Sequence, residues 1–121
     1  MTNNKPSDER TGGLERRETL LPYEVRRLLA PLHSCKQASG EGIARIRFFA
    51  PWARWAWYIA EYDGDDTLWG FVDAFKREYG YFVLSEIESL RGPGGLRVHR
   101  DRHFRPVRLG DLAAALSAWE G

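Results

Sequence analysis

The feature that most constrains this chain is an aromatic stretch that runs straight into a tight-turn signal. From Trp55 to Tyr62, apolar residues occupy both sets of alternate positions, as in a strand that is buried on both faces. Asp63-Gly64 follows directly, and glycine adopts the positive φ of a tight turn without strain. A second apolar stretch begins at Thr67. Because short turns join antiparallel neighbours, the sequence predicts a hairpin at the centre of an antiparallel sheet.

Two further stretches extend this sheet to about four strands. Residues 43–50 alternate between apolar and charged side chains, so one face of that strand is expected to contact water. After a turn predicted at Glu78-Tyr79-Gly80, the chain returns as a short fourth strand. The predicted strands cover approximately residues 43–50, 55–62, 67–75 and 80–84.

Helices are predicted before and after the sheet, so the fold class is α+β. Leucines recur at helical spacing after Pro22, which predicts an N-terminal amphipathic helix that ends at Pro31. Ser85 and Glu88 have the spacing of a capping box, in which each side chain bonds the other residue's backbone amide. They predict a short capped helix directly after the sheet. The last elements are a long Arg/Gly-rich loop over residues 91–106 and a C-terminal helix from Leu109.

The chain has 121 residues, which is enough for one domain with one modest core. Residues 1–17 are polar and charged, and we predict a disordered or loosely attached tail there and a single domain over 18–121. No apolar run approaches the length of a membrane span, and the lone Cys35 cannot form an internal disulfide. We therefore expect a cytoplasmic protein without membrane contact.

Three tryptophans between residues 52 and 57 raise the question of a stacking platform for nucleic-acid bases. Aromatic residues at alternate strand positions are also good sheet formers and large core fillers. A platform needs exposed rings with basic residues between them, whereas Arg54 is the only base from residue 52 to residue 66. We therefore predict core packing. The platform remains the alternative, because Arg45 and Arg47 could flank an exposed face from the neighbouring strand.

Four acids lie at the end of the aromatic strand. Asp63, Asp65 and Asp66 could hold a hard cation, but their spacing is shorter than a complete calcium loop and lacks its distal glutamate. We predict turn chemistry and no metal there. Glu61 lies within the strand beside aromatic residues, and a partly buried carboxylate needs a partner. We expect that partner to be an arginine of the basic segment that follows the sheet.

This basic segment, residues 91–108, contains six arginines, two histidines and a single acid, Asp101. His99 and His103 have the spacing of a metal pair only on a helix, and the glycines before them and Pro106 after them disfavour a helix. We expect Asp101 to anchor the loop by accepting backbone amides or an arginine. The sequence contains no cysteine cluster, phosphate-binding loop or nucleophile elbow, so we predict no catalytic residue and no cofactor. The candidate partner-binding residues are Asp63, Asp65 and Asp66, together with Arg97, Arg100, Arg102, Arg105 and Arg108.

Five short motifs, taken together, resemble the DUF2958 family. They are Phe48-Phe49-x-Pro51, Trp57-Tyr58-x-x-Glu61-Tyr62-Asp63, Trp69-Gly70-Phe71-Val72, Glu78-Tyr79-Gly80-Tyr81-Phe82-x-Leu84-x-Glu86 and Arg100-Asp101-x-x-Phe104-x-Pro106. The resemblance covers about residues 20–109, and the longer charged N-terminus and the Ala-rich final helix depart from it. It implies a small bacterial protein carried on mobile genetic elements, and it implies no reaction, because the family has no assigned activity. The motif residues expected to matter are Trp57, Tyr58, Glu61, Gly70, Gly80, Tyr81, Phe82 and Asp101.

The expected function is therefore binding rather than catalysis. In its sharpest form, the protein inhibits a host defence complex, of the CRISPR or restriction type, by occluding a surface with its charged patches. The alternative is a nucleic-acid-binding accessory protein that uses the arginines of residues 91–108 on phosphates. A third reading is a metal-dependent enzyme that uses Glu61, Asp63, Asp66, His99 or His103.

Overall fold

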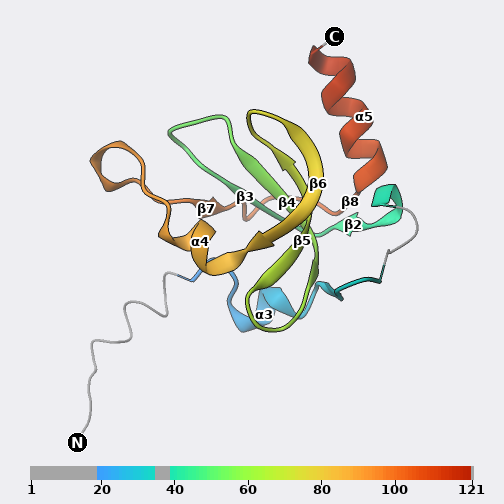
Figure 1. Ribbon diagram of the computed structural model, residues 1–121, viewed down its shortest axis with the longest axis horizontal. Helices are drawn as coiled ribbons and strands as arrows, with labels where there is room; N and C mark the ends of the chain where they lie inside the picture. The colour runs from blue at the N-terminus through green and yellow to red at the C-terminus, as the bar shows by residue number, and fades with distance from the viewer. Residues whose placement is uncertain (1–18, 35–38, 121) are drawn as a thin grey trace, which may run out of the picture.

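A mostly antiparallel sheet of six strands forms the centre of the fold in the computed structural model, which describes residues 19–34 and 39–120 (Figure 1). The order across the sheet is β6-β5-β4-β3-β7, and β1 pairs in parallel with β4. The α+β class is confirmed, with more strands in the sheet than the four predicted. The strands of this sheet are β1 (Ala30–Pro31), β3 (Ile46–Phe49), β4 (Ala56–Tyr62), β5 (Thr67–Asp73), β6 (Arg77–Val83) and β7 (His99–Arg100).

The first predicted strand is divided at Arg45. Its beginning, β2 (Ile43–Ala44), pairs with β8 (Val107–Arg108) in a separate two-stranded sheet, whereas β3 pairs with β4. The Arg45 amide donates to the carbonyl of Ile59 at 3.0 Å, so the chain stays close to β4 across the break. The predicted alternation survives the division, because Ala44, Ile46 and Phe48 are all buried.

A β-bulge at Ala60 changes the faces of the central strand. Ile59 pairs with Gly70 and Glu61 pairs with Trp69, so Ala60 is the extra residue of β4. Strict alternation along the predicted strand places Tyr62 on the same face as Ala60, and this prediction is wrong. The bulge reverses the alternation, and Tyr62 packs in the core cluster that contains Ile59.

The second hairpin turn lies earlier than predicted. Glu78, Tyr79 and Gly80 belong to β6 and pair with β5, so the turn predicted at these residues is wrong. The chain reverses around Phe75 instead, where the Ala74 amide donates to the carbonyl of Lys76 at 3.1 Å. Alternation along the predicted strand places Phe75 on the same side as Trp69 and Phe71, whereas in the structure it is 92% exposed.

The N-terminal helix is much shorter than predicted. Only α3 (Tyr23–Arg26) is helical, and Leu28, which belonged to the predicted apolar stripe, is exposed. Ala30 and Pro31 form β1 instead, beside Glu61 and Tyr62 of β4. Pairing of β1 with β4, beyond the start of β3, thus replaces the second half of the predicted helix.

The helix after the sheet, α4 (Leu84–Ser89), does not begin with a capping box, so this prediction is wrong. The Ser85 hydroxyl and amide both bond Asp66 from the β4–β5 turn, at 2.7 and 2.9 Å. Glu88 instead accepts from the hydroxyl of Thr19 and the amide of Leu20, each at 2.8 Å. Both partners are distant in the sequence. The other helices of the described residues are α5 (Leu109–Glu120) and two 3-10 turns, η2 (Ser39–Glu41) and η3 (Pro93–Gly95).

The core lies on both faces of the sheet. One cluster packs beneath the N-terminal segment and α4 and contains Trp57, while the other packs against α5 and contains Trp69 (Figure 1). Trp57 is 8% exposed, and Trp52 and Trp55 are partly buried against the first cluster, so the predicted core packing of the tryptophans is confirmed. Within the described part of the chain, none of the helices combines the length and the apolar character needed to cross a membrane. The predicted tail over 1–17 and Cys35 lie outside the described residues.

Candidate functional site

The acidic tip, defined as Asp63, Asp65 and Asp66, is largely occupied by its own turn. The Oδ1 atom of Asp63 accepts the amides of Asp65, Asp66 and Thr67 at 2.8, 3.1 and 3.1 Å. These backbone hydrogen bonds, that from Asp65 foremost, lower the pKa of Asp63. Asp66 bonds Ser85 through both carboxylate oxygens, which leaves Asp65 as the tip carboxylate most open to a partner. The partner-binding role of the tip stays a prediction.

Glu61 is the buried charged residue of β4, with 3% of its surface exposed. Its Oε1 atom accepts the backbone amide of His33 at 2.8 Å. His33 has a positive φ of 70°, so this contact holds an unusual backbone conformation two residues after the end of β1. Arg45 and Glu61 also line one cavity of about 290 Å³. The expected ion pair between Glu61 and an arginine of residues 91–108 stays a prediction.

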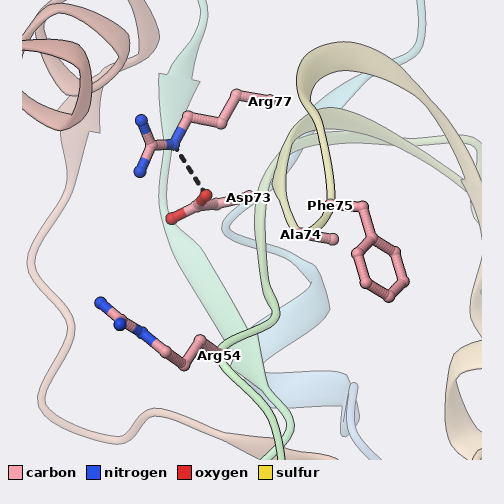
Figure 2. Close-up of a pocket in the computed structure, with 5 residues that line it drawn as sticks. All are labelled: Arg54, Asp73, Ala74, Phe75 and Arg77. Atoms are coloured by element: carbon pink, nitrogen blue, oxygen red, sulfur yellow. Dashed lines mark hydrogen bonds and ion pairs between the residues drawn. The ribbon is translucent and has the colours of Figure 1, made fainter. Parts of the chain in front are cut away.

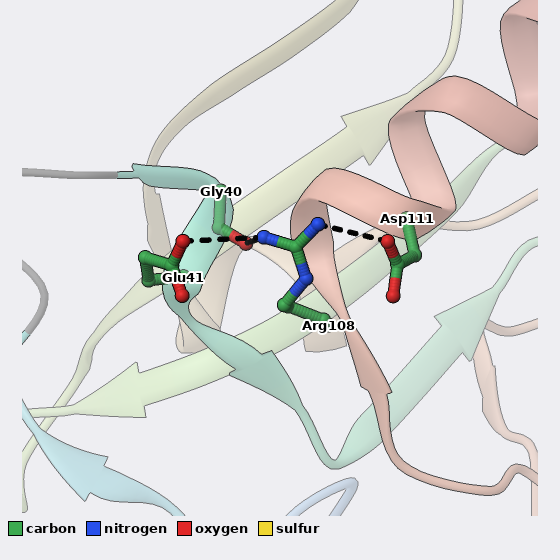
Figure 3. Close-up of polar contacts among 4 residues, drawn as sticks. All are labelled: Gly40, Glu41, Arg108 and Asp111. Atoms are coloured by element: carbon green, nitrogen blue, oxygen red, sulfur yellow. Dashed lines mark hydrogen bonds and ion pairs between the residues drawn. The ribbon is translucent and has the colours of Figure 1, made fainter.

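Several charged residues of the basic segment hold the fold together. Asp101 bonds Arg47 through its side chain at 3.2 Å and through its amide at 2.8 Å, and it also accepts the His103 amide at 2.9 Å. The predicted anchoring of this loop by Asp101 is therefore confirmed. Arg108 lies between η2 and α5, where it bonds Glu41 at 3.3 Å and Asp111 at 2.8 Å (Figure 3).

Three of the predicted arginines gather at one place. Arg97, Arg100 and Arg102 line a cavity of about 220 Å³ together with Thr19, and we call this the arginine cavity. Burial lowers the pKa of Arg100, and the neighbouring charge of Arg102 lowers it further. Arg105 is exposed and does not line the cavity.

The two histidines of the basic segment lie in different structural elements. His99 lies in β7, where its ring stacks on Phe49 with centroids 5.8 Å apart, whereas His103 follows in the loop. Across residues 19–34 and 39–120, no group of three or more histidine, cysteine, aspartate or glutamate side chains is placed to share a metal ion.

Sequence reasoning missed a surface at one end of the sheet, where the β3–β4 connection meets the β5–β6 turn (Figure 1). We call it the aromatic end surface and define it by Trp52, Arg54, Trp55 and Phe75. The Phe75 ring packs edge-on against Trp55 with centroids 5.7 Å apart, and Trp55 packs edge-on against Trp52 at 6.4 Å. The three rings form a continuous row that ends in the exposed phenyl ring.

Two cavities open beside this row, of about 440 and 520 Å³, and both are lined by Arg54 and Asp73. Figure 2 shows the Arg54 guanidinium directed to the same side as the ion pair between Asp73 and Arg77, which is 2.8 Å long. The Phe75 ring points away from that pair. No carboxylate within the described ranges forms an ion pair with Arg54. The sequence signal that could have revealed this surface is Phe75, an aromatic residue between Asp73 and Lys76. Its exposure is explained by the β5–β6 turn, which falls at this residue, earlier in the chain than predicted.

The remaining family-motif residues have identifiable structural roles or positions. Trp57 and Tyr58 are buried in β4, one in each core cluster. A Cβ atom on Gly70 would lie 1.9 Å from the Tyr58 carbonyl oxygen, so no larger residue fits there without moving the backbone. Gly80, opposite Gly70 on β6, has open space around it. Tyr81 is 58% exposed, while Phe82 is partly buried against the first core cluster.

Comparison with known proteins matches one family. The model of that family, described as a protein of unknown function (DUF2958), matches residues 20–119. No curated protein and no solved structure matches the sequence. The match spans the whole sheet, the arginine cavity from Leu20 onward and the aromatic end surface.

Proposed function

We propose a function from the geometry of the structure. The chain belongs to the DUF2958 family, and the description of that family gives no function to start from. In this proposal the protein acts by binding another protein, and the aromatic end surface is its contact face. The observation that carries the proposal is the 92% exposure of Phe75 at the end of a row of packed aromatic rings.

The composition of this surface is that of a binding hot spot. Tryptophan, tyrosine and arginine dominate the residues whose truncation costs most at protein interfaces. Trp55 and Trp52 are already packed, so they would lose little side-chain entropy when a partner covers them. Phe75 leaves its ring in water, and burying it fully in a partner pocket would contribute about 2 kcal/mol.

The charges around the rings favour an acidic partner surface. Arg54 and Phe75 line the same cavity, with the guanidinium on the side of the Asp73–Arg77 pair and the phenyl ring directed away from it. A carboxylate of the partner could reach the guanidinium fork of Arg54 on that side. We therefore propose a partner that offers an apolar pocket bordered by acidic groups. The mobile-element origin that the family resemblance implies supports a host defence complex, of the CRISPR or restriction type, as the partner class.

The test is a comparative capture from a bacterial host lysate, with cross-linking and identification of the bound proteins. Phe75→Ala should weaken capture of the specific partner about tenfold or more, because it removes the exposed ring and leaves the packed rings in place. Tyr23→Ala is the matched control, because Tyr23 is also an exposed aromatic residue, at 67%, but lies on α3.

Both variants should keep the thermal stability of the wild type, since neither ring is buried. If every captured protein binds Phe75→Ala and Tyr23→Ala equally well, the aromatic end surface is not the contact face. A plasmid-interference assay in cells that carry a CRISPR or restriction system then tests the partner class. Wild type should relieve interference and Phe75→Ala should not, whereas undiminished interference with the wild type would contradict an anti-defence role.

A further inference from the structure

Two of the arginines that line the arginine cavity, Arg100 and Arg102, have no acidic partner among the described residues. Within the described part of the chain, no carboxylate forms a hydrogen bond or an ion pair with the guanidinium of Arg100 or Arg102. The nearest acid in the sequence, Asp101, already bonds Arg47 and the His103 amide. Glu88, which contacts Thr19 at the cavity wall, is occupied by the hydroxyl of that residue and by the Leu20 amide.

The backbone places these arginines without help from a ligand. Arg100 is held in β7, opposite Phe48 of β3. Arg97 pairs with Arg91 in an isolated bridge, and the Gly92 amide closes the loop by donating to the Leu96 carbonyl at 2.7 Å. The backbone that carries these arginines is therefore held before an anion binds, so the entropy lost on binding is chiefly that of the side chains.

Partial burial makes this charge unfavourable until an anion enters. The pKa of Arg100 is lowered chiefly by burial and secondarily by Arg102, so both effects disfavour the charged guanidinium. An oxyanion in the cavity would offset both effects, because it supplies opposite charge and accepts the guanidinium hydrogen bonds. The planar guanidinium fork suits oxyanions with two or more oxygens, and clustered arginines suit the high charge of a phosphate.

We propose that the arginine cavity binds a phosphate group. The cavity volume of about 220 Å³ accommodates a phosphate with part of the group attached to it. Two sources share this chemistry, namely a free phosphate and the backbone of a nucleic acid. The proposal is independent of the aromatic end surface, because the residues that line the arginine cavity and those that define that surface do not overlap.

The experiment titrates the full chain with inorganic phosphate and, separately, with a single-stranded DNA oligonucleotide across a salt series. Binding is followed through the side-chain Nε–Hε signals of the arginines in NMR spectra. We expect the signals of Arg97, Arg100 and Arg102 to shift first. Arg102→Gln should lower the affinity about tenfold or more, because it removes one charge-assisted contact from the cavity.

Arg105→Gln is the matched control, because Arg105 is an exposed arginine of the same segment outside the cavity. It should leave the affinity for inorganic phosphate unchanged. Much tighter, salt-dependent binding of the oligonucleotide would identify a nucleic acid as the source, and equal binding per phosphate would identify a free phosphate. The proposal is overturned if neither probe binds, or if Arg105→Gln weakens binding as much as Arg102→Gln.

Discussion

A single methyl group added at Gly70 should disrupt the centre of the sheet. The added Cβ would lie 1.9 Å from the carbonyl oxygen of Tyr58, about 1 Å closer than the 3.0 Å below which real Cβ contacts essentially do not occur. The obstacle is the backbone of β4, which cannot rotate away as a flexible side chain would. Relief requires β4 and β5 to separate where Gly70 pairs with Ile59.

The size of the effect follows from what must move. Overpacking of a well-packed core costs about 1–3 kcal/mol and occasionally more. Because the clash involves backbone in the middle of the sheet, we expect Gly70→Ala to lower the free energy of unfolding by about 3 kcal/mol or more. For a domain of this size, that corresponds to a fall in Tm of roughly 10–20 °C.

The chain contains its own control for this prediction. Gly80 pairs directly with Gly70 on the neighbouring strand, but a Cβ on Gly80 would meet nothing within 4 Å. Gly80→Ala removes backbone freedom from the unfolded chain without a clash, so it should raise the free energy of unfolding by about 0.5–1 kcal/mol. Urea unfolding of both variants, read as midpoint and slope, measures the difference. If Gly70→Ala unfolds within about 0.5 kcal/mol of the wild type, the close-approach reasoning is wrong.

Two further predictions concern the acidic tip. Asp66→Ala should lower the free energy of unfolding by about 1 kcal/mol, because it removes the acceptor for Ser85 at the start of α4. Asp65→Ala, with no side-chain hydrogen bond in the turn, should leave the urea midpoint nearly unchanged, and equal losses would contradict the cap. The pKa of Asp63 is lowered from its usual 3.8, so its stabilising effect is fully present above pH 3.8 and is lost as the pH falls through the lower folded-state pKa. Asp63→Asn should remove that part of the pH dependence of the unfolding free energy, and a profile identical to that of the wild type would refute the assignment.

The local parts of the fold were readable from the sequence. The strands predicted at 55–62 and 67–75 contain β4 and β5, the second with two residues too many. They were predictable because the Asp63-Gly64 turn and the alternating apolar residues act between neighbours in the chain. The second turn was misplaced because Gly80 was taken as a turn signal. Glycine also occurs inside strands, and here its position opposite Gly70 keeps it within β6.

The errors share a cause in contacts between distant segments. Ser85 and Glu88 have the right local spacing for a capping box, yet Asp66 and Thr19 compete successfully for them. The N-terminal apolar stripe fits a helix, yet pairing of Ala30 with Glu61 takes its end into the sheet. The spacing of residues along the chain contains no information about these partners, because each partner comes close only once the sheet has formed.

The difference between local and distant contacts also explains why the sequence indicated the arginines of the arginine cavity but not the aromatic end surface. The arginine cavity draws its arginines from six consecutive residues, so the charge density was visible before the fold was known. The aromatic end surface joins Trp55 to Phe75 across two strand connections, and the joining depends on where the second turn falls. Had β5 continued to residue 75 as predicted, the Phe75 ring would have extended the core face. Because the strand ends at Asp73 instead, the phenyl ring is exposed to water, and its only packed neighbour within the described aromatic contacts is Trp55. The predicted and observed lengths of β5 thus differ by two residues, and this difference makes Phe75 the most exposed large apolar side chain of the described fold instead of a core residue. This exposure is the physical basis for proposing the contact face at this end of the sheet.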